Sequence, residues 1–365
     1  MTASLTPDPR LRDLLGIQVP VFGFSHELDV VAAVSQAGGL GVWGATRSTP
    51  EEIKEGLASL RERLGNAPFG VDLVLPKGMP ETNDRTSIED TLPAGHRAFV
   101  EGIRERYAVP DDGLPGLRSR FVRSAEIEAR QIQAVLESDA NAFALGIGSP
   151  LEVVQAAKDR GKTVISLVGA PRHAQAALRL GADILVAQGY DAGAHTGPIG
   201  TFSLVPKIVD LAGDVPVLAA GGVATGRHIA ASLALGAAGV WMGSAWLVTE
   251  ENGTDPLLLK KLLAAGIEDT VISRADSGKT LRQIRTAWTD EWNAPGAPQP
   301  LPMPHQDILV GDLLGAIDRH QVEPLMHIPA GQSIGYFSAP ATVKDVITSL
   351  TAEAREVLGR LSPES

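Results

Sequence analysis

One short stretch of the chain combines the residue types that bind a ligand and move protons. It reads Ala187-Gln188-Gly189-Tyr190-Asp191-Ala192-Gly193-Ala194-His195-Thr196-Gly197 and directly follows an apolar run. Glycines let a backbone approach a bound ligand closely, and Gln188, Asp191 and His195 carry hydrogen-bonding side chains. An imidazole is the group here that ordinarily titrates near neutral pH. We therefore predict that His195 is catalytic and that Gln188, Gly189 and Gly193 contact the ligand.

Two glycine-rich turns farther along the chain have the composition of an anion-binding site. The first is Ala219-Ala220-Gly221-Gly222-Val223-Ala224-Thr225-Gly226-Arg227, and the second is Met242-Gly243-Ser244. Backbone N–H groups of such turns, and of a helix start behind them, point together at one anion. The arginine at the start of the following helix would also favour a nearby anion. These turns predict a phosphate-bearing ligand, with tight turns needed only for packing as the alternative.

Eight short apolar runs could position these residues. Each ends at glycine or polar residues, and most are separated by segments with helix signals, which predicts a repeated β then α pattern. A closed (β/α)8 TIM barrel is the α/β fold that eight such units build, and catalytic loops then follow the strands. A doubly wound open sheet is the alternative, although it more usually has about five to seven strands. The predicted strands are residues 19–24, 39–43, 69–75, 142–147, 163–168, 183–187, 215–219 and 239–242.

Several helix ends are marked by specific residues. Thr49-Pro50-Glu51-Glu52 and Ser149-Pro150-Leu151-Glu152 both have the pattern of a capping box with proline near the helix start. Gly161, Gly181 and Gly236 stand where a helix end favours a left-handed residue. These signals support the count of β/α units.

The spacing of the runs also predicts the domain organisation. Residues 1–250 form the barrel, with an insertion after strand three at about 76–140 that contains a helix over 125–137. The insertion could be a lid over the catalytic face or a surface excursion that supports an oligomer contact. Residues 251–340 form a helical and irregular appendage near the barrel mouth, with helices over 257–265 and 307–320 and an irregular, proline-rich segment over 288–304. Apolar residues at helical spacing over 341–361 predict a last helix, and residues 341–365 are expected to pack back on the barrel.

Composition excludes several classes of function. The formal net charge of -11 argues against nucleic acid or an anionic membrane surface as a partner. The absence of cysteine excludes disulfides, thiolate metal sites and cysteine nucleophiles, and no histidine pattern indicates a metal site. The chain has no apolar run of about 18 residues, and its first ten residues lack the apolar core of a signal peptide. We therefore expect a soluble, cytoplasmic protein. The sequence leaves open whether the protein forms a homodimer.

Taken together, the motifs resemble those of the nitronate monooxygenases, formerly called 2-nitropropane dioxygenases. The resemblance rests on Gln-Gly-x-(Asp/Glu)-Ala-Gly-x-His-x-Gly at 188–197, on the Pro-Val-x-Ala-Ala-Gly-Gly turn at 216–222, and on Leu-Gly-Ala-x-Gly-Val-x-Met-Gly-Ser at 235–244. Shorter blocks match at 19–20, 37–41, 68–73 and 331–335, so the resemblance extends over nearly the whole chain. Flavin-dependent enoyl-thioester reductases form a related branch.

The resemblance implies FMN at the barrel mouth. Its phosphate would lie on Gly221, Gly222, Gly243 and Ser244, with Gln188 and Gly189 beside the isoalloxazine and His195 facing its reactive side. The remaining positions implied at the cofactor are Gly193, Ala220, Asp72, Gly23 and Phe24. The implied reaction uses O2 to convert an alkyl nitronate into a carbonyl compound and nitrite. A related anionic or carbonyl compound is the other small-molecule substrate expected.

Three features depart from the family pattern, of which Ala194, in place of a glycine before His195, is a small change and the other two bear on the cofactor. The turn after strand one usually contains methionine, whereas this chain reads Val21-Phe22-Gly23-Phe24-Ser25-His26. The family often has asparagine where this chain has Asp72, and a carboxylate beside a flavin disfavours the anionic reduced form.

Two other functions stay open: an FMN-dependent reductase or dehydrogenase of an enoyl or acyl thioester, and a phosphate-binding barrel without flavin. His26 and His173 are weaker candidates for the barrel mouth, and Lys279, Arg282 and Arg285 for a basic cluster that meets acyl-CoA phosphates.

Overall fold

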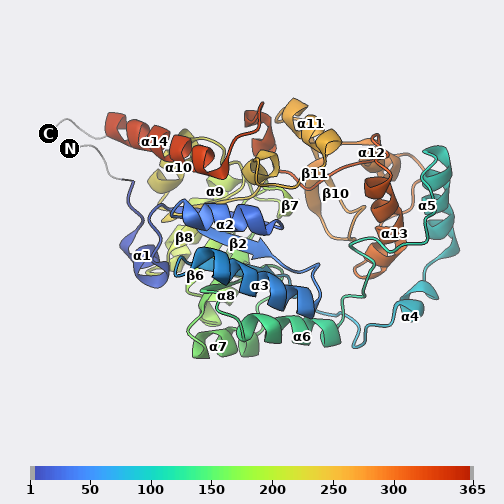
Figure 1. The fold of residues 1–365 in the computed structure, drawn as a ribbon, viewed down its shortest axis with the longest axis horizontal. Coiled ribbons are helices and arrows are strands. Elements are labelled where there is room, and N and C mark those ends of the chain that lie inside the picture. The colour runs from blue at the N-terminus through green and yellow to red at the C-terminus, as the bar shows by residue number, and fades with distance from the viewer. Residues whose placement is uncertain (1–4, 362–365) are drawn as a thin grey trace.

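The fold of the computed structural model, which describes residues 5–361, is built around a closed barrel of eight parallel strands (Figure 1). Neighbouring strands pair in chain order, and the barrel closes where Gly23 of the first strand lies opposite Met242 of the last. The predicted TIM-barrel fold is therefore confirmed. The barrel strands are β1 (Val21–Ser25), β2 (Leu40–Gly44), β3 (Phe69–Leu73), β4 (Ala142–Leu145), β5 (Thr163–Val168), β6 (Ile184–Gln188), β8 (Val217–Ala220) and β9 (Gly239–Met242).

Helices follow the strands and cover the outside of the barrel, as the β/α pattern requires. A short helix, α1 (Pro9–Leu15), precedes the first strand. None of the described helices is long and apolar enough to cross a membrane. The helices between the barrel strands, outside the insertion, are α2 (Leu28–Gln36), α3 (Pro50–Leu64), α7 (Leu151–Asp159), α8 (Pro171–Arg179), α9 (Thr201–Ala212) and α10 (Gly226–Ala234).

Most of the predicted helix ends are correct. Thr49 and Glu52 form a reciprocal capping box at the start of α3. Gly161, Gly181 and Gly236 have φ angles of 70°, 89° and 91° at the ends of their helices. The second predicted capping box is wrong, because α7 begins after Pro150 without a side-chain cap. Its proposed capping serine instead lies with its Oγ 3.4 Å from Oγ of Ser166 on β5.

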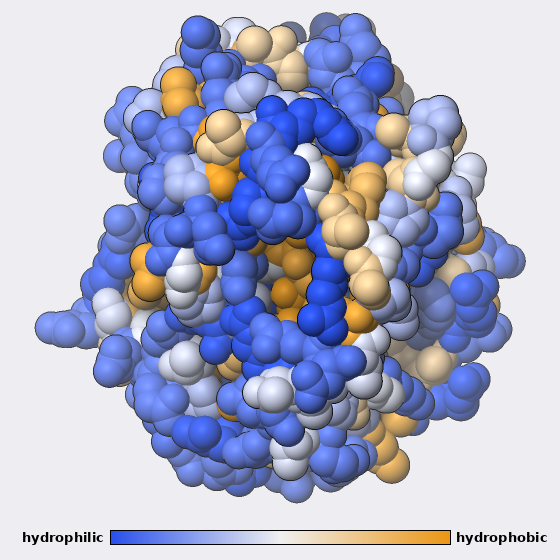
Figure 2. Space-filling view, turned by 90° about the vertical axis from the view of Figure 1, so that its right-hand side faces the viewer, coloured by the Kyte–Doolittle hydropathy of each residue, from blue (hydrophilic) through white to orange (hydrophobic). Residues whose placement is uncertain are grey.

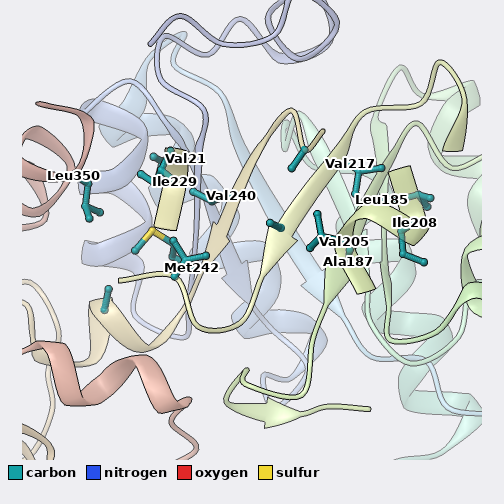
Figure 3. Close-up of a cluster of buried hydrophobic side chains, with 14 of the residues drawn as sticks. Val21, Leu185, Ala187, Val205, Ile208, Val217, Ile229, Val240, Met242 and Leu350 are labelled. Atoms are coloured by element: carbon teal, nitrogen blue, oxygen red, sulfur yellow. The ribbon is translucent and has the colours of Figure 1, made fainter. Parts of the chain in front are cut away.

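Strand residues are buried on both faces, which is why the strands read as continuous apolar runs. Phe22, Leu40, Ile165 and Leu218 fill the barrel interior, and none has any exposed surface. Residues that alternate with them pack outward against the helices. Figure 3 shows part of this outer layer, in which Val21, Leu185, Ala187, Val217, Val240 and Met242 from the strands meet Val205, Ile208, Ile229 and Leu350 from α9, α10 and α14.

The segment between β3 and β4 carries α4 (Arg85–Glu89), α5 (Ala94–Arg106) and α6 (Ala125–Leu136). Helices α4 and α5 lie beside α13 (His305–Arg319), at the right-hand end of the view in Figure 1. Arg85 pairs with Asp312 of α13, and Arg319 of α13 pairs with Asp112. Most of the insertion thus packs on the C-terminal part of the chain.

After β9 the chain forms a short 3-10 helix, η1 (Ser244–Val248), and then α11 (Pro256–Ala264). It continues through α12 (Ala287–Asn293), α13, η2 (Gln332–Tyr336) and α14 (Val343–Leu361), and α14 packs on α10 and α2. The prediction that residues 288–304 are irregular is wrong over α12. The boundary residues 1–4 and 362–365 of the predicted domains lie outside the described part.

Sequence reasoning missed a three-stranded antiparallel sheet beside the barrel. It consists of β10 (Thr270–Ser273), β11 (Leu281–Ile284) and β7 (Ala194–His195), in the order β10-β11-β7. The region predicted as helical and irregular therefore also contains strands. The strands are only two to four residues long and are separated by up to 86 positions, so no local alternation pattern marks them.

Candidate active site

A cavity of about 740 Å³ opens at the carboxyl ends of the barrel strands. Its walls come from the ends of β1, β3, β4, β5, β6, β8 and β9, together with parts of α8 and the segment after β10. The face drawn in Figure 2 is hollowed at its centre, with hydrophobic side chains inside a mostly hydrophilic rim. Of the predicted site residues, those that line the cavity are Phe24, Asp72, Gln188, Gly193, His195, Ala220, Gly221, Gly222, Gly243 and Ser244.

Two predicted cofactor contacts do not line the cavity. A Cβ added at Gly23 would lie 2.6 Å from Val34 of α2, so this glycine faces the helix layer. A Cβ added at Gly189 would lie 2.1 Å from the hydroxyl of Thr201, at the start of α9. Both positions need glycine for close packing of the helix layer on the strand ends. The geometry therefore gives no support to direct contact of these two residues with a ligand.

His195 lies on β7, a two-residue strand that pairs with β11. This pairing holds the half-buried imidazole at the cavity wall, with Nε2 3.1 Å from Oγ of Ser277. Burial, together with the positive charges of Arg118 and Arg47, lowers the pKa of His195 to about 4. The imidazole is therefore neutral near pH 7.

The glycine-rich turns present backbone N–H groups at the cavity. Gly221 and Gly222 have φ angles of 93° and 78°, which favour glycine. Within residues 5–361, the N–H groups of Gly221, Gly222 and Val223 donate to no protein acceptor. Ser244 accepts from the N–H of Gly331 at 2.8 Å, so this serine also holds the C-terminal segment beside the turns.

The helix start behind the first turn does not add a cation. Arg227 pairs with Glu353 of α14 at 3.3 Å, and its side chain is 66% exposed. His228 Nδ1 accepts from the N–H groups of Ala224 and Thr225. The side chains of Arg227 and His228 are therefore engaged within the protein and add no free cation at the cavity.

Asp72 is a buried carboxyl group at the cavity wall. It lies on β3, is 4% exposed, and has no hydrogen-bond partner at Oδ2 among the described residues. Burial raises its pKa to about 7, although Arg123 acts in the opposite direction. Asp72 can therefore carry a proton at neutral pH and donate a hydrogen bond into the cavity.

A buried network of charges lies behind His195, and sequence reasoning missed it. Arg118 contacts both Asp307 and Asp276, at 3.5 and 3.2 Å, and Arg47 contacts Asp307 at 2.7 Å. Asp276 also accepts from Trp288 and meets His327. Although burial alone would raise the pKa of Asp276, these partners lower it well below its ordinary value.

This network joins three distant parts of the chain. Arg47 follows β2, and Arg118 belongs to the insertion. Asp276 comes from the segment after β10, and Asp307 comes from α13. Arg123 lies close enough to lower the pKa of His195 as well. At His195 the positive charges of these three arginines outweigh the negative charge of Asp307, and this positive potential favours an anion in the cavity.

The predicted basic cluster does not form. Arg282 is buried and donates to Tyr190 O and Thr270, whereas Arg285 pairs with Asp290. Lys279 alone of the three lines the cavity, as do His26 and His173 from other loops. No group of three or more His, Asp or Glu side chains suited to a metal ion occurs in the described part.

Comparisons with known proteins agree with this geometry. The sequence pattern of the nitronate monooxygenase family matches residues 9–353. A Mycobacterium tuberculosis protein assigned as a monooxygenase is 40% identical, covering 96% of this chain and 98% of its own. A Staphylococcus haemolyticus protein assigned as a nitronate monooxygenase is 32% identical, covering 77% of this chain and 79% of its own.

Solved structures of related enzymes superpose on nearly the whole chain. Nitroalkane oxidase from Streptomyces ansochromogenes superposes with a TM-score of 0.82 at 26% identity, over 97% of this chain and all of its own. FabK from Thermotoga maritima superposes with a TM-score of 0.76 at 28% identity, over 98% of this chain and 99% of its own. The chain is therefore an oxidoreductase that belongs to the nitronate monooxygenase family.

Proposed function

We propose that this protein is an FMN-dependent monooxygenase that oxidises alkyl nitronates with O2 to a carbonyl compound and nitrite. The observation that carries the proposal is one cavity that combines the free N–H groups of residues 221–223 with the imidazole of His195. A phosphate group fits the first feature, because it needs several N–H donors pointing at one place. The cavity volume, about 740 Å³, lies in the range of sites for small molecules and cofactors.

The residues present fit a flavin mononucleotide. The N–H groups of Gly221, Gly222 and Val223 would hold the phosphate, while Gln188 and Asp72 line the same cavity and carry polar groups suited to the edge of a flavin ring. Asp72 in particular has an unpartnered buried oxygen. When bound, FMN supplies the redox chemistry of the reaction.

The protein's own part in this reaction is to bind and orient the substrate. Surplus positive charge from Arg47, Arg118 and Arg123 favours an anionic nitronate beside His195. The neutral imidazole donates a hydrogen bond to a nitronate oxygen. The apolar parts of the wall, including Phe24 and Trp241, exclude water.

The test compares two electron donors. The purified protein is expected to be yellow, with absorbance near about 450 nm, and an alkyl nitronate should bleach it without oxygen. NAD(P)H should leave the colour unchanged. Colourless protein that releases no flavin on denaturation would refute FMN binding.

His195 is tested by His195→Asn, which keeps a polar side chain but removes the imidazole. We expect turnover of the nitronate to fall by about 10²- to 10³-fold while flavin remains bound, because the imidazole N–H no longer stabilises negative charge on the substrate. His96→Asn is a matched control, because His96 of α5 does not line the cavity and its Nε2 contacts the carbonyl oxygen of Gln299 at 2.9 Å. Unchanged turnover in His195→Asn would refute the catalytic assignment.

A second candidate function is an FMN-dependent reductase or dehydrogenase of an enoyl or acyl thioester. It is favoured by Lys279, which lines the cavity and could meet an acidic group of a large substrate. A relative from Rhodococcus jostii, 30% identical over 76% of this chain and 65% of its own length, is named as an octahydroindene carboxyl-CoA dehydrogenase. Rapid reduction of the flavin by NAD(P)H, with none by a nitronate, would favour this function.

A further inference from the structure

The contact between His195 and Ser277 determines more than the place of the imidazole. Ser277 lies in the segment between β10 and β11, 82 positions beyond His195, and its side chain has no exposed surface. Its Oγ lies 3.1 Å from Nε2 of His195. Because a hydroxyl has one proton and two lone pairs, this contact can run in either direction.

The other contacts of Ser277 favour one direction. Its Oγ already accepts the N–H of Lys279 at 3.4 Å. Among the described residues, Nε2 of His195 is the acceptor available to its proton. If Nε2 carried the proton instead, the hydroxyl proton of Ser277 would stay buried without an acceptor, which is costly.

We infer that Ser277 is a positioning residue that donates its hydroxyl proton to Nε2 of His195 and so fixes the imidazole as the tautomer protonated on Nδ1. Within residues 5–361 Nδ1 has no hydrogen-bond partner, and His195 lines the cavity, so this N–H is available to a ligand. The lone pair that could accept a proton is occupied by Ser277. His195 is thereby a donor to an anion and not a base.

This assignment deepens the proposed function and rests on it where it concerns substrate. A nitronate has oxygens with negative charge, which accept the Nδ1–H bond. A neutral nitroalkane would need a base, and in this tautomer no free nitrogen of His195 can serve as one. We therefore infer a preference for preformed nitronates over neutral nitroalkanes.

The surroundings of Ser277 explain how the contact is held. The neighbouring Asp276 is tied to Arg118 at 3.2 Å and to Trp288 at 3.0 Å, and so does not compete for the hydroxyl. Gly278 has a φ of 74°, and a Cβ there would lie 1.9 Å from the carbonyl oxygen of Leu301. The segment is therefore fixed on both sides of Ser277.

The first experiment measures the tautomer directly. Protein labelled with ¹⁵N in its histidines, purified as it is isolated, is examined at pH 7 by long-range proton–nitrogen correlation spectroscopy. The signal missing from His195→Asn identifies His195. We expect Nδ1 protonated and Nε2 unprotonated, and the reverse pattern would overturn the inference.

The second experiment tests the role of the hydroxyl. Ser277→Ala should shift His195 toward the other tautomer, whereas Ser277→Thr, which keeps a hydroxyl, should retain the original pattern. Ser273→Ala is the matched control, because Ser273 is a buried serine at the end of β10 that bonds Ala275 and not His195. An unchanged pattern in Ser277→Ala would overturn the role of Ser277, and if that variant fails to fold, the unsubstituted protein and Ser277→Thr still decide the tautomer.

The third experiment concerns substrate choice. In Ser277→Ala, kcat/KM for a primary alkyl nitronate should fall by about tenfold, in line with the loss of one hydrogen bond, and the ratio of nitronate to nitroalkane activity should fall with it. An unchanged ratio would overturn the substrate preference. If the unsubstituted protein oxidises no nitronate at all, the proposed function fails, while the spectroscopic result still decides the tautomer.

Discussion

Replacing Asp72 with asparagine should stabilise the protein, and the gain should grow with pH. The side chain keeps its shape but loses a charge that has no partner at Oδ2. Burial raises the pKa of Asp72 from 3.8 to about 7. A carboxyl whose pKa is higher in the folded state opposes folding once the unfolded chain ionises. This penalty begins as pH rises through 3.8 and is complete above pH 7.

The size of the effect follows from the two pKa values. Each tenfold change in an equilibrium constant corresponds to about 1.4 kcal/mol, so the gap between 3.8 and about 7 corresponds to about 4 kcal/mol at pH 8. At pH 4 the unfolded carboxyl is only partly ionised, and the difference should be under about 1 kcal/mol. Asp72→Asn should therefore gain several kcal/mol in free energy of unfolding between these two pH values.

Urea unfolding of both proteins from pH 4 to pH 8 measures this difference. Asp13→Asn is the control, because the Asp13 side chain is 76% exposed and its loss should change stability by under about 0.5 kcal/mol at any pH. A difference for Asp72→Asn that stays constant with pH, or a loss of stability at pH 8, would refute the idea that a buried, unpaired carboxylate opposes folding here.

Three further variants test local strain and burial through their free energies of unfolding. Ala194→Gly should stabilise by about 1 kcal/mol, because Ala194 has a φ of 60°; a loss of stability would contradict strain there. Gly221→Ala should destabilise by about 1–3 kcal/mol and weaken FMN binding, since its Cβ would lie 2.8 Å from a backbone nitrogen. Gly213→Ala is its control, because Gly213 also has a positive φ, of 58°, but an added Cβ there would meet no atom within 4 Å. Equal losses of stability in the two variants would exclude a role for the close contact at Gly221. Asp276→Asn should destabilise by about 3–5 kcal/mol, because Arg118 and His327 lose a buried carboxylate; a loss under about 1 kcal/mol would show that the network matters little.

The barrel could be predicted because its signals are local. Each strand is an apolar run buried on both faces, and each run ends at glycine or a polar residue. The capping box at Thr49 and Glu52 depends on residues three positions apart and was correct. The box at Ser149 failed because its hydroxyl meets Ser166 on a neighbouring strand, which no local pattern contains.

Some of the predicted site residues line the cavity, and others face the helix layer. Gln188 ends β6, and the turn at Gly221 and Gly222 follows β8. The carboxyl ends of all barrel strands meet at one face, where the cavity opens. Gly23 also belongs to a strand, but alternation along the strand turns it toward α2. Gly189 follows a strand and yet faces Thr201 of α9, whereas Phe24 and Asp72 lie within strands and do line the cavity. Residue type therefore did not decide which of the predicted positions reach the cavity.

By itself, the sequence determined the barrel, the family and the imidazole at the barrel mouth, because short-range patterns specify all three. Only the tertiary structure decided what surrounds that imidazole. Ser277 and the buried arginines reach it from segments far away in the chain, and the short sheet that joins β7 to β11 leaves no periodic signal. Protonation depends on burial and on charges that folding brings near, so the state of His195 and of Asp72 could be assigned only in the folded chain.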